Sequence, residues 1–267
     1  MLVGIDHVVL ACADPDATAD VLERRLGLAA TAGGRHDALG TFNRLIWLGD
    51  TYLELVGVFD VELASRSWLG RPVIAALDAG EGGLATWSIA VDDLDETLRW
   101  APPGAGLLGP EDGERRRQDG RVVRWRLARP DELTPTASFL IEHDLEAAEW
   151  SLPDRAERAH EQHPFGGRAR LAALEIEAAS PAAAAARLRS LVAASVEPAG
   201  RAAIRVRLGD QEVRFVHSRP GSAAVIDIIG DVPLRTRIAR VGDCEIRLRG
   251  RPADVGAPPQ PDEVADV

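Results

Sequence analysis

Three stretches of this 267-residue chain begin with the same pattern, and this repetition restricts the possible folds more than any other feature. They start at Gly4, Gly83 and Arg170 and read GIDHVVLACADPDATADVLERRLGL, GLATWSIAVDDLDETLRW and RLAALEIEAASPAAAAARLRSLV. In each stretch an apolar run of strand character reaches a polar turn, and apolar residues at helical spacing follow. The sequence therefore predicts a fold built from repeated strand–helix units.

The turns of all three stretches carry residues that start helices. Asp14, Asp93 and Ser180 each offer a side-chain oxygen to the free backbone N–H groups of a first helical turn. Proline follows Asp14 and Ser180, at the first helical position, where a helix tolerates it best. We therefore expect a helix after each of the three turns.

Candidate strands follow each predicted helix. After the first helix they cover residues 29–37, 42–49 and 51–58. After the second helix they cover residues 121–127 and 138–143, with 102–113 as a long loop. After the third helix they cover residues 202–208, 212–217 and 223–229, and a further strand at 244–249 is expected at a sheet edge. The expected fold class is α+β, with repeated βαβββ units.

These elements divide the chain into four parts. We expect a paired βαβββ domain over residues 3–145, a linker over 146–167 and a third βαβββ-like unit over 168–250. Residues 251–267 are rich in proline and acidic side chains and contain little that could pack, which predicts a disordered tail.

Composition and charge exclude several classes of function. The net charge of -11 and the pI of about 5.1 oppose nucleic-acid binding, which depends on clustered cations. Cys12 and Cys244 lie far apart, so neither a disulfide framework nor a thiolate zinc site is expected. No stretch approaches the roughly 18 apolar residues of a membrane span, and no secretory leader is recognisable. We expect a cytoplasmic protein that does not bind membranes.

Several segments resemble one known family. They are GGRHDALGTFNRLIWLGDTYLELVGV, QDGRVVRWRL, ASFLIEHD and HPFGG, and the first is the most specific. With the βαβββ repeat, they are similar to glyoxalase-like domain proteins of the vicinal oxygen chelate superfamily. The resemblance implies two paired units that curl into a half-open barrel with helices outside, and a third unit attached. It also implies a small-molecule cavity, and a homodimer is a further expectation.

The resemblance also bears on metal binding. In metal-using members the ligands lie on the first and last strands of the paired units, and these positions match His7 and Glu54 in the first unit. The second unit has Thr86 and Ile141 instead, so the resemblance does not support a tightly bound four-ligand metal site. His143 lies two residues beyond Ile141, and a divalent metal on His7, Glu54 and His143 stays open as an alternative.

Two of these residues are the candidate catalytic groups. Glu54 is flanked by leucines on a strand, where a lone carboxylate is costly unless it meets a cation, a metal or a proton. An ion pair with Arg44 is the alternative structural role for Glu54. His7 should be neutral if buried, as a ligand or as a hydrogen-bonded core residue.

Other residues are candidates for the cavity wall. His36 and Asn43 follow a glycine-rich turn and are expected at the cavity mouth. Two tryptophans on predicted strands, Trp87 and Trp125, would supply apolar wall. The remaining candidate substrate-binding residues are Arg44, His143 and His163. His143 could instead end a strand, and His163 could form a turn in the linker.

Three functions follow from this pattern. A metal-dependent lyase, isomerase or dioxygenase would hold a vicinal-oxygen substrate on a metal. A binding or sequestering protein, as in drug resistance, would use the same cavity without metal. A metal-free enzyme would use Glu54 as the base. The chain has no GxSxG, HExxH or phosphate-binding glycine motif, so hydrolases and nucleotide enzymes of those types are not expected.

Overall fold

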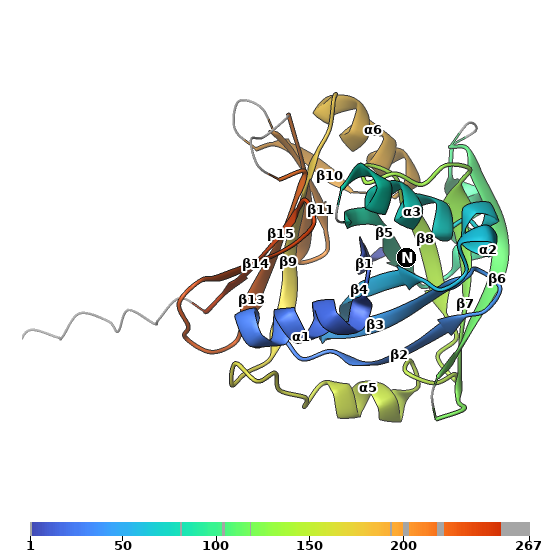
Figure 1. The fold of residues 1–267 in the computed structure, drawn as a ribbon. Coiled ribbons are helices and arrows are strands. Elements are labelled where there is room, and N and C mark those ends of the chain that lie inside the picture. Colours follow the sequence, from blue (N-terminus) through green and yellow to red (C-terminus); the bar gives the residue numbers. More distant parts are fainter. Residues whose placement is uncertain are drawn as a thin grey trace, which may run out of the picture.

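The computed structural model describes residues 2–80, 82–102, 105–117, 119–192, 194–199, 203–217 and 222–251. Over these residues the chain forms a closed eight-stranded barrel and a separate seven-stranded sheet. Figure 1 shows the barrel in blue to green and the second sheet, in yellow to red, on its left. The fold class is α+β, as the sequence predicts.

The barrel contains two βαβββ units. The first consists of β1 (Leu2–Ala11), α1 (Pro15–Leu26), β2 (Thr31–His36), β3 (Thr41–Leu48) and β4 (Thr51–Val58). Two helices connect the units, α2 (Val61–Arg66) and α3 (Gly70–Ala79). The second unit consists of β5 (Gly83–Val91), α4 (Leu94–Trp100), β6 (Leu107–Arg117), β7 (Val122–Pro130) and β8 (Ser138–His143).

The predicted helix starts are present. The Asp14 side chain accepts hydrogen bonds from the backbone N–H groups of Asp16 and Ala17 at the start of α1. Asp93 caps α4 in the same way, and Ser180 caps α6 (Pro181–Leu191). Each cap satisfies N–H groups that have no partner within the helix.

One predicted loop is in part a strand. Residues 107–113, expected within the loop 102–113, belong to β6, which pairs antiparallel with β7. Most residues of this part of β6 are polar or glycine, so they lack the apolar alternation by which a strand is recognised. The backbone ladder to β7, which joins residues distant in sequence, holds the strand instead.

The barrel order is β1-β4-β3-β2-β6-β7-β8-β5. The two units join through the antiparallel pairing of β1 with β5. On the opposite side they meet through β2 and β6, with only Gly34 and Arg35 in register with Arg117 and Arg116. This short contact closes the curved sheets, which the family resemblance predicted to be half open.

The second sheet contains the third repeat. Its elements are β9 (Ala169–Glu177), α6, β10 (Ser195–Pro198), β11 (Ala203–Leu208), β12 (Gln211–Val216), β13 (Ala224–Gly230), β14 (Arg237–Val241) and β15 (Cys244–Arg249). The strand order is β10-β11-β12-β9-β13-β15-β14. Strand β15, expected at the edge, lies one strand inside it because β14 pairs with it. Strand β12 pairs parallel with β9, as β4 does with β1, so the third unit ends at β12 and not at the expected strand 223–229. By this register, the positions that match His7 and Glu54 carry Ala173 and Arg214.

One hydrophobic cluster joins the barrel to the second sheet. It contains Val8 and Trp87 from the barrel together with Leu174, Phe215 and Ile246 from the sheet. Helix α1 contacts β3 and β4 and also β14, which strengthens the same junction. The face of β1 and β4 toward the second sheet is therefore mostly apolar, apart from Thr51, whose hydroxyl accepts a hydrogen bond from Gln211 of β12.

The segment between barrel and sheet contains α5 (Leu152–Arg158). Of the tail expected to be disordered, residues 252–267 lie outside the described residues. None of the helices in the described parts of the chain is long and apolar enough to cross a membrane.

Strand β2 requires glycine at position 33. A Cβ there would overlap the backbone oxygen of Asn43, and the register with β3 shifts between Ala32 and Arg35. We expect Gly33→Ala to push β2 away from β3 and to lower the free energy of unfolding by about 1–3 kcal/mol. Urea unfolding measures this change, and a stability equal to wild type would contradict the tight strand contact.

Candidate active site

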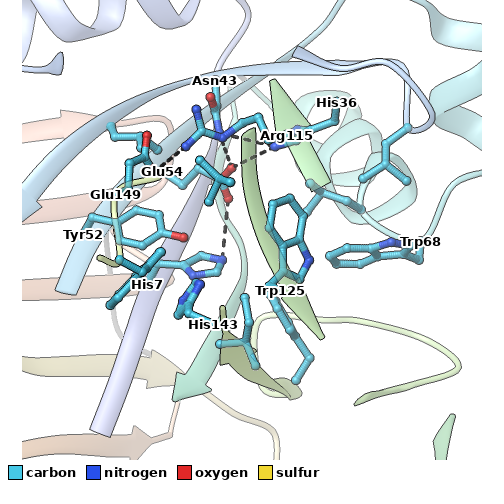
Figure 2. A pocket seen from close by; sticks show the side chains of 17 residues that line it. His7, His36, Asn43, Tyr52, Glu54, Trp68, Arg115, Trp125, His143 and Glu149 are labelled. Atoms are coloured by element: carbon cyan, nitrogen blue, oxygen red, sulfur yellow. Dashed lines mark hydrogen bonds and ion pairs between the residues drawn. The ribbon is translucent and has the colours of Figure 1, made fainter. Parts of the chain in front are cut away.

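The barrel encloses a cavity with a polar side and an apolar side. The polar lining residues are His7, His36, Asn43, Glu54, Arg115, His143 and Glu149. The apolar and aromatic lining residues are Leu39, Leu45, Tyr52, Trp68, Leu69, Val123, Trp125, Phe139, Ile141 and Trp150. Figure 2 shows Glu54 in the middle of the polar side, with His7, His36 and Asn43 around its carboxylate. Such an apolar wall with a few convergent polar groups is typical of small-molecule sites.

Strand alternation directs Glu54 into the cavity. Its neighbours Leu53 and Leu55 point outward into the hydrophobic cluster, so Glu54 points inward. The carboxylate is almost fully buried, with 5% of the residue exposed. Nε2 of His7 lies 3.6 Å from its Oε2, and Nε2 of His36 lies 3.7 Å from its Oε1. His7 and Glu54 are thus side by side on the paired strands β1 and β4.

Asn43 holds the Glu54 carboxylate. Its Nδ2 donates a hydrogen bond of 2.5 Å to Oε1 of Glu54. The amide orientation is fixed because the backbone N–H of Gly34 donates to Oδ1 of Asn43 over 2.8 Å. The partner of Glu54 is therefore Asn43, and the ion pair with Arg44 considered from the sequence is absent from the described side chains.

Asp6 orients His7. Strand β1 shifts register against β5 between Ile5 and Val8, and this irregularity allows the consecutive side chains of Asp6 and His7 to meet. Oδ1 of Asp6 lies 2.5 Å from Nδ1 of His7, and Ser88 Oγ lies 2.8 Å from the same nitrogen. A carboxylate only accepts, so Nδ1 carries the proton toward Asp6 and Nε2 faces Glu54.

Asp6 also binds His143. Nε2 of His143 lies 2.8 Å from Oδ2 of Asp6, and the ring stacks on Trp150 with centroids 3.7 Å apart. Burial alone would raise the pKa of Asp6, but attraction and hydrogen bonds from His143 and His7 outweigh it and hold this pKa well below its usual range. Asp6 is therefore an anion that ties the two histidines together.

A buried ion-pair cluster forms another part of the polar side. Glu149 accepts hydrogen bonds of 2.7 Å from Nη2 of Arg115 and from Nη1 of Arg117. Its backbone has a positive φ of 71°, and its N–H donates to Asp154 over 2.7 Å. The segment after β8, expected to be only a linker, thus contributes Glu149 and Trp150 to the cavity.

Burial controls the ionisation of His36 and Tyr52. Desolvation lowers the pKa of His36 to about 4, although the charge of Glu54 opposes this, so His36 is neutral at pH 7. Its Nδ1 lies 3.0 Å from the Thr41 hydroxyl. Desolvation, with the charges of Asp6 and Glu54, raises the pKa of Tyr52 well above 10, so the phenol keeps its proton.

His36 should make stability depend on pH. The unfolded imidazole binds a proton below pH 6.5 and the folded one only below about 4, so the unfolded state holds more protons between these values. Stability should fall by about 3 kcal/mol as pH drops through this window. His163 acts in the same direction because burial lowers its pKa as well. Urea unfolding of wild type and His36→Gln at pH 4.5 and 7 isolates the His36 part, and equal pH dependence would contradict it.

Three candidate site residues lie outside the cavity lining. Arg44 alternates with the inward Asn43, points outward and pairs with Asp16 over 2.6 Å. Trp87 alternates with Ser88, packs in the hydrophobic cluster and donates its Nε1–H to the Pro135 carbonyl. Strand alternation thus corrects the expectation for both residues.

His163 is the third of these residues. Its Nδ1 accepts from the backbone N–H of Ala29, and its Nε2 lies 2.8 Å from the Trp47 carbonyl oxygen. The side chain ties the linker to the first unit from outside the barrel. These contacts agree better with the alternative role of His163 in forming a turn of the linker than with a role in substrate binding.

The remaining candidates line the cavity together: His7, His36, Asn43, Glu54, Trp125 and His143. Residues absent from the sequence-based set are Asp6, Tyr52, Trp68, Arg115 and Glu149. Tyr52 could have been predicted to line the cavity, because it precedes Glu54 by two residues on the same strand face. The sequence gives no comparable indication for Arg115, because it lies in a run of three arginines next to the expected loop.

The residues present do not fit a metal of the glyoxalase type. Ile141 lies in the cavity where a ligand would be needed, and Thr86 donates its hydroxyl to the Ala137 carbonyl. His143 turns its Nε2 to Asp6, so it does not join His7 and Glu54. Within the described residues no group of three His, Cys, Asp or Glu side chains could hold a metal ion.

A family model described as a glyoxalase-like domain matches residues 5–192. The chain belongs to this family. It is therefore a glyoxalase-like domain protein, as the sequence motifs indicated. No curated protein matches the sequence significantly.

One solved structure shares the fold of this glyoxalase-like protein over most of the chain, and two others match about half of it. A hypothetical protein from Staphylococcus aureus matches with a TM-score of 0.75 and 15% identity, and covers 92% of this chain and 99% of its own. Methylmalonyl-CoA epimerase from Streptomyces coelicolor matches with 21% identity and a TM-score of 0.40 over 53% of this chain and 98% of its own. Methylmalonyl-CoA epimerase from Mycobacterium tuberculosis matches with 22% identity and a TM-score of 0.39, and covers 53% of this chain and 88% of its own. The first match extends over nearly the whole chain, so the barrel and second sheet form a recurring arrangement.

Proposed function

We propose that the barrel cavity is an active site for proton transfer on a small carbonyl compound, as in an isomerase or a lyase, with Glu54 as the base. One observation carries this proposal. A buried carboxylate has one oxygen held by Asn43, while the other faces the cavity beside His7. A base fixed in this way inside an apolar enclosure is suited to abstract a proton from carbon.

The reaction would begin at a C–H bond next to a carbonyl group. Oε2 of Glu54 takes the proton, and the bonding electron pair moves onto the carbonyl oxygen to give an enolate. Tyr52 supports this step, because its phenol keeps its proton and its hydroxyl points into the cavity (Figure 2). It can donate a hydrogen bond to the enolate oxygen. Returning the proton to another carbon completes an isomerisation, and loss of a neighbouring leaving group completes a lyase reaction.

Asp6 and His143 act as positioning residues in this proposal. They fix the ring of His7 so that its Nε2 stays beside Oε2 of Glu54. A fixed neighbour limits the rotation of the carboxylate and so keeps the base directed at the substrate.

The aromatic wall supports a substrate with an apolar part. Trp68 and Phe139 contact each other edge to face with centroids 5.4 Å apart, and Trp125 lies edge to face with His36 at 6.4 Å. Flat aromatic surfaces of this kind bury hydrocarbon at little entropic cost.

A second candidate function is ligand binding without turnover. It is favoured by Ile141, which makes the second unit's equivalent of Glu54 apolar.

Proton NMR in D₂O separates the two functions. The protein is incubated with a panel of small carbonyl compounds, and loss of the C–H signal next to the carbonyl is followed. We expect protein-dependent exchange for one class of compound. Compounds that bind without exchange or conversion would favour the binding function.

A further inference from the structure

The guanidinium of Arg115 is the buried cation of the cavity wall. The residue is 4% exposed, and its Nη2 is paired with Glu149. Its Nη1 is also buried but has no hydrogen-bond partner among the described residues. A buried N–H group of a charged side chain without a partner is costly, so such a group indicates a missing partner.

Glu149 does not satisfy the whole guanidinium of Arg115. This carboxylate is shared between Arg115 and Arg117, and Arg117 also pairs with Asp119. Among the described side chains, Glu54 forms no ion pair with Arg115 within 4 Å. The ion-pair contacts of Glu54 are instead the weak ones to His7 and His36.

Arg115 and Glu54 nevertheless face the same space. Both line the cavity, and both charges act on the ring of His36 and the phenol of Tyr52, in opposite directions. Gly34, which has no side chain, leaves room for the guanidinium: a Cβ there would lie 3.1 Å from Nη1. The cavity is therefore bordered by both a cation and a carboxylate base.

We propose that the substrate is a small organic acid whose carboxylate binds to Arg115 while the C–H bond that reacts faces Glu54. A 2-oxo acid fits this arrangement best, because its ketone acidifies the C–H on the next carbon and its carboxylate is at the other side of the ketone. An apolar tail would lie against Trp68 and Trp125. This inference rests on the proposed function for the reacting C–H, but the carboxylate site can be measured without turnover.

Two matched probes test the carboxylate site. Phenylacetate and phenylacetamide have nearly the same shape, and only the first carries a negative charge. Calorimetry, or the fluorescence of the cavity tryptophans, gives the affinity of each. A charge-assisted hydrogen bond should make wild type bind the acid at least about tenfold more tightly than the amide. Equal affinity, or no measurable binding of the acid, overturns the proposal.

Variants locate the site. Arg115→Gln should abolish the preference for the acid, whereas Arg115→Lys should keep part of it. Arg117→Gln is the matched control, because it removes the other arginine from Glu149 and should leave the preference unchanged. A preference that persists in Arg115→Gln overturns the proposal. If circular dichroism shows that Arg115→Gln does not fold, the test uses the ratio of phenylacetate to phenylacetamide affinity in wild type and in Arg115→Lys. A ratio that is not lower in Arg115→Lys then overturns the proposal.

Failure of the carboxylate site and failure of the proposed function give different results. Glu54→Gln should bind phenylacetate at least as tightly as wild type, because a negative charge is removed near the ligand. If phenylacetate binds but no 2-oxo acid, phenylpyruvate included, exchanges its C–H proton, the carboxylate site on Arg115 is supported and the catalytic role of Glu54 is rejected. Equal exchange of neutral ketones and 2-oxo acids rejects the carboxylate site and leaves the catalytic role intact.

Discussion

Glu54→Gln is expected to lower the rate of C–H exchange by about 10²–10⁴-fold, the usual contribution of a positioned base. The amide has the shape of the carboxylate and can still accept from Asn43, but it cannot take a proton. Glu54→Asp should retain a small part of the rate, because the shorter side chain moves the base away from the substrate. The measurement is the initial rate of signal loss in D₂O.

Arg44→Gln is the matched control for this experiment. Arg44 lies on β3 beside Asn43 but points outward to Asp16, so its removal should leave the exchange rate unchanged. Substrate affinity should survive in Glu54→Gln, which separates a chemical defect from a binding defect. Exchange in Glu54→Gln at the wild-type rate would show that another group is the base.

Glu149→Gln is expected to lower the free energy of unfolding by about 3–5 kcal/mol, because removal of one partner from a buried ion pair leaves an uncompensated charge. Arg115 is the group left uncompensated, since its paired Nη2 loses the carboxylate. Arg117 is a quarter exposed at its side chain and can turn to solvent, so it should add little to the loss. Urea unfolding gives the difference directly.

Glu146→Gln provides the comparison for this stability change. Glu146 is an exposed glutamate in the same segment, and its substitution should change stability by no more than about 0.5 kcal/mol. If Glu149→Gln is as stable as wild type, the cluster does not act as a buried ion pair. The cavity wall would then need another source of rigidity.

The repeat and its helices could be predicted because their signals are local. Each cap at Asp14, Asp93 and Ser180 satisfies N–H groups within three residues of itself. Strand β6 could not be predicted in full, because its first half is held by backbone pairing with β7 and carries little apolar pattern. Local chemistry therefore defined the units, and distant pairing completed the barrel.

The candidate site divides in the same way. Glu54 on strand β4 could be placed inside from its leucine neighbours. Asp6 could not, because its contact with His7 depends on an irregularity in the pairing of β1 with β5. Glu149 could not either, because the segment after β8 reaches the cavity only through contacts with residues distant in the chain.

The central claim is that Glu54 transfers protons in this cavity without a metal. The most direct measurement is the C–H exchange rate together with elemental analysis on the same samples, before and after dialysis against a chelator. We predict that wild type exchanges at the same rate in both samples, without stoichiometric metal, and that Glu54→Gln does not exchange. A rate that follows the bound metal, disappears on chelation and returns with a divalent ion would contradict this account.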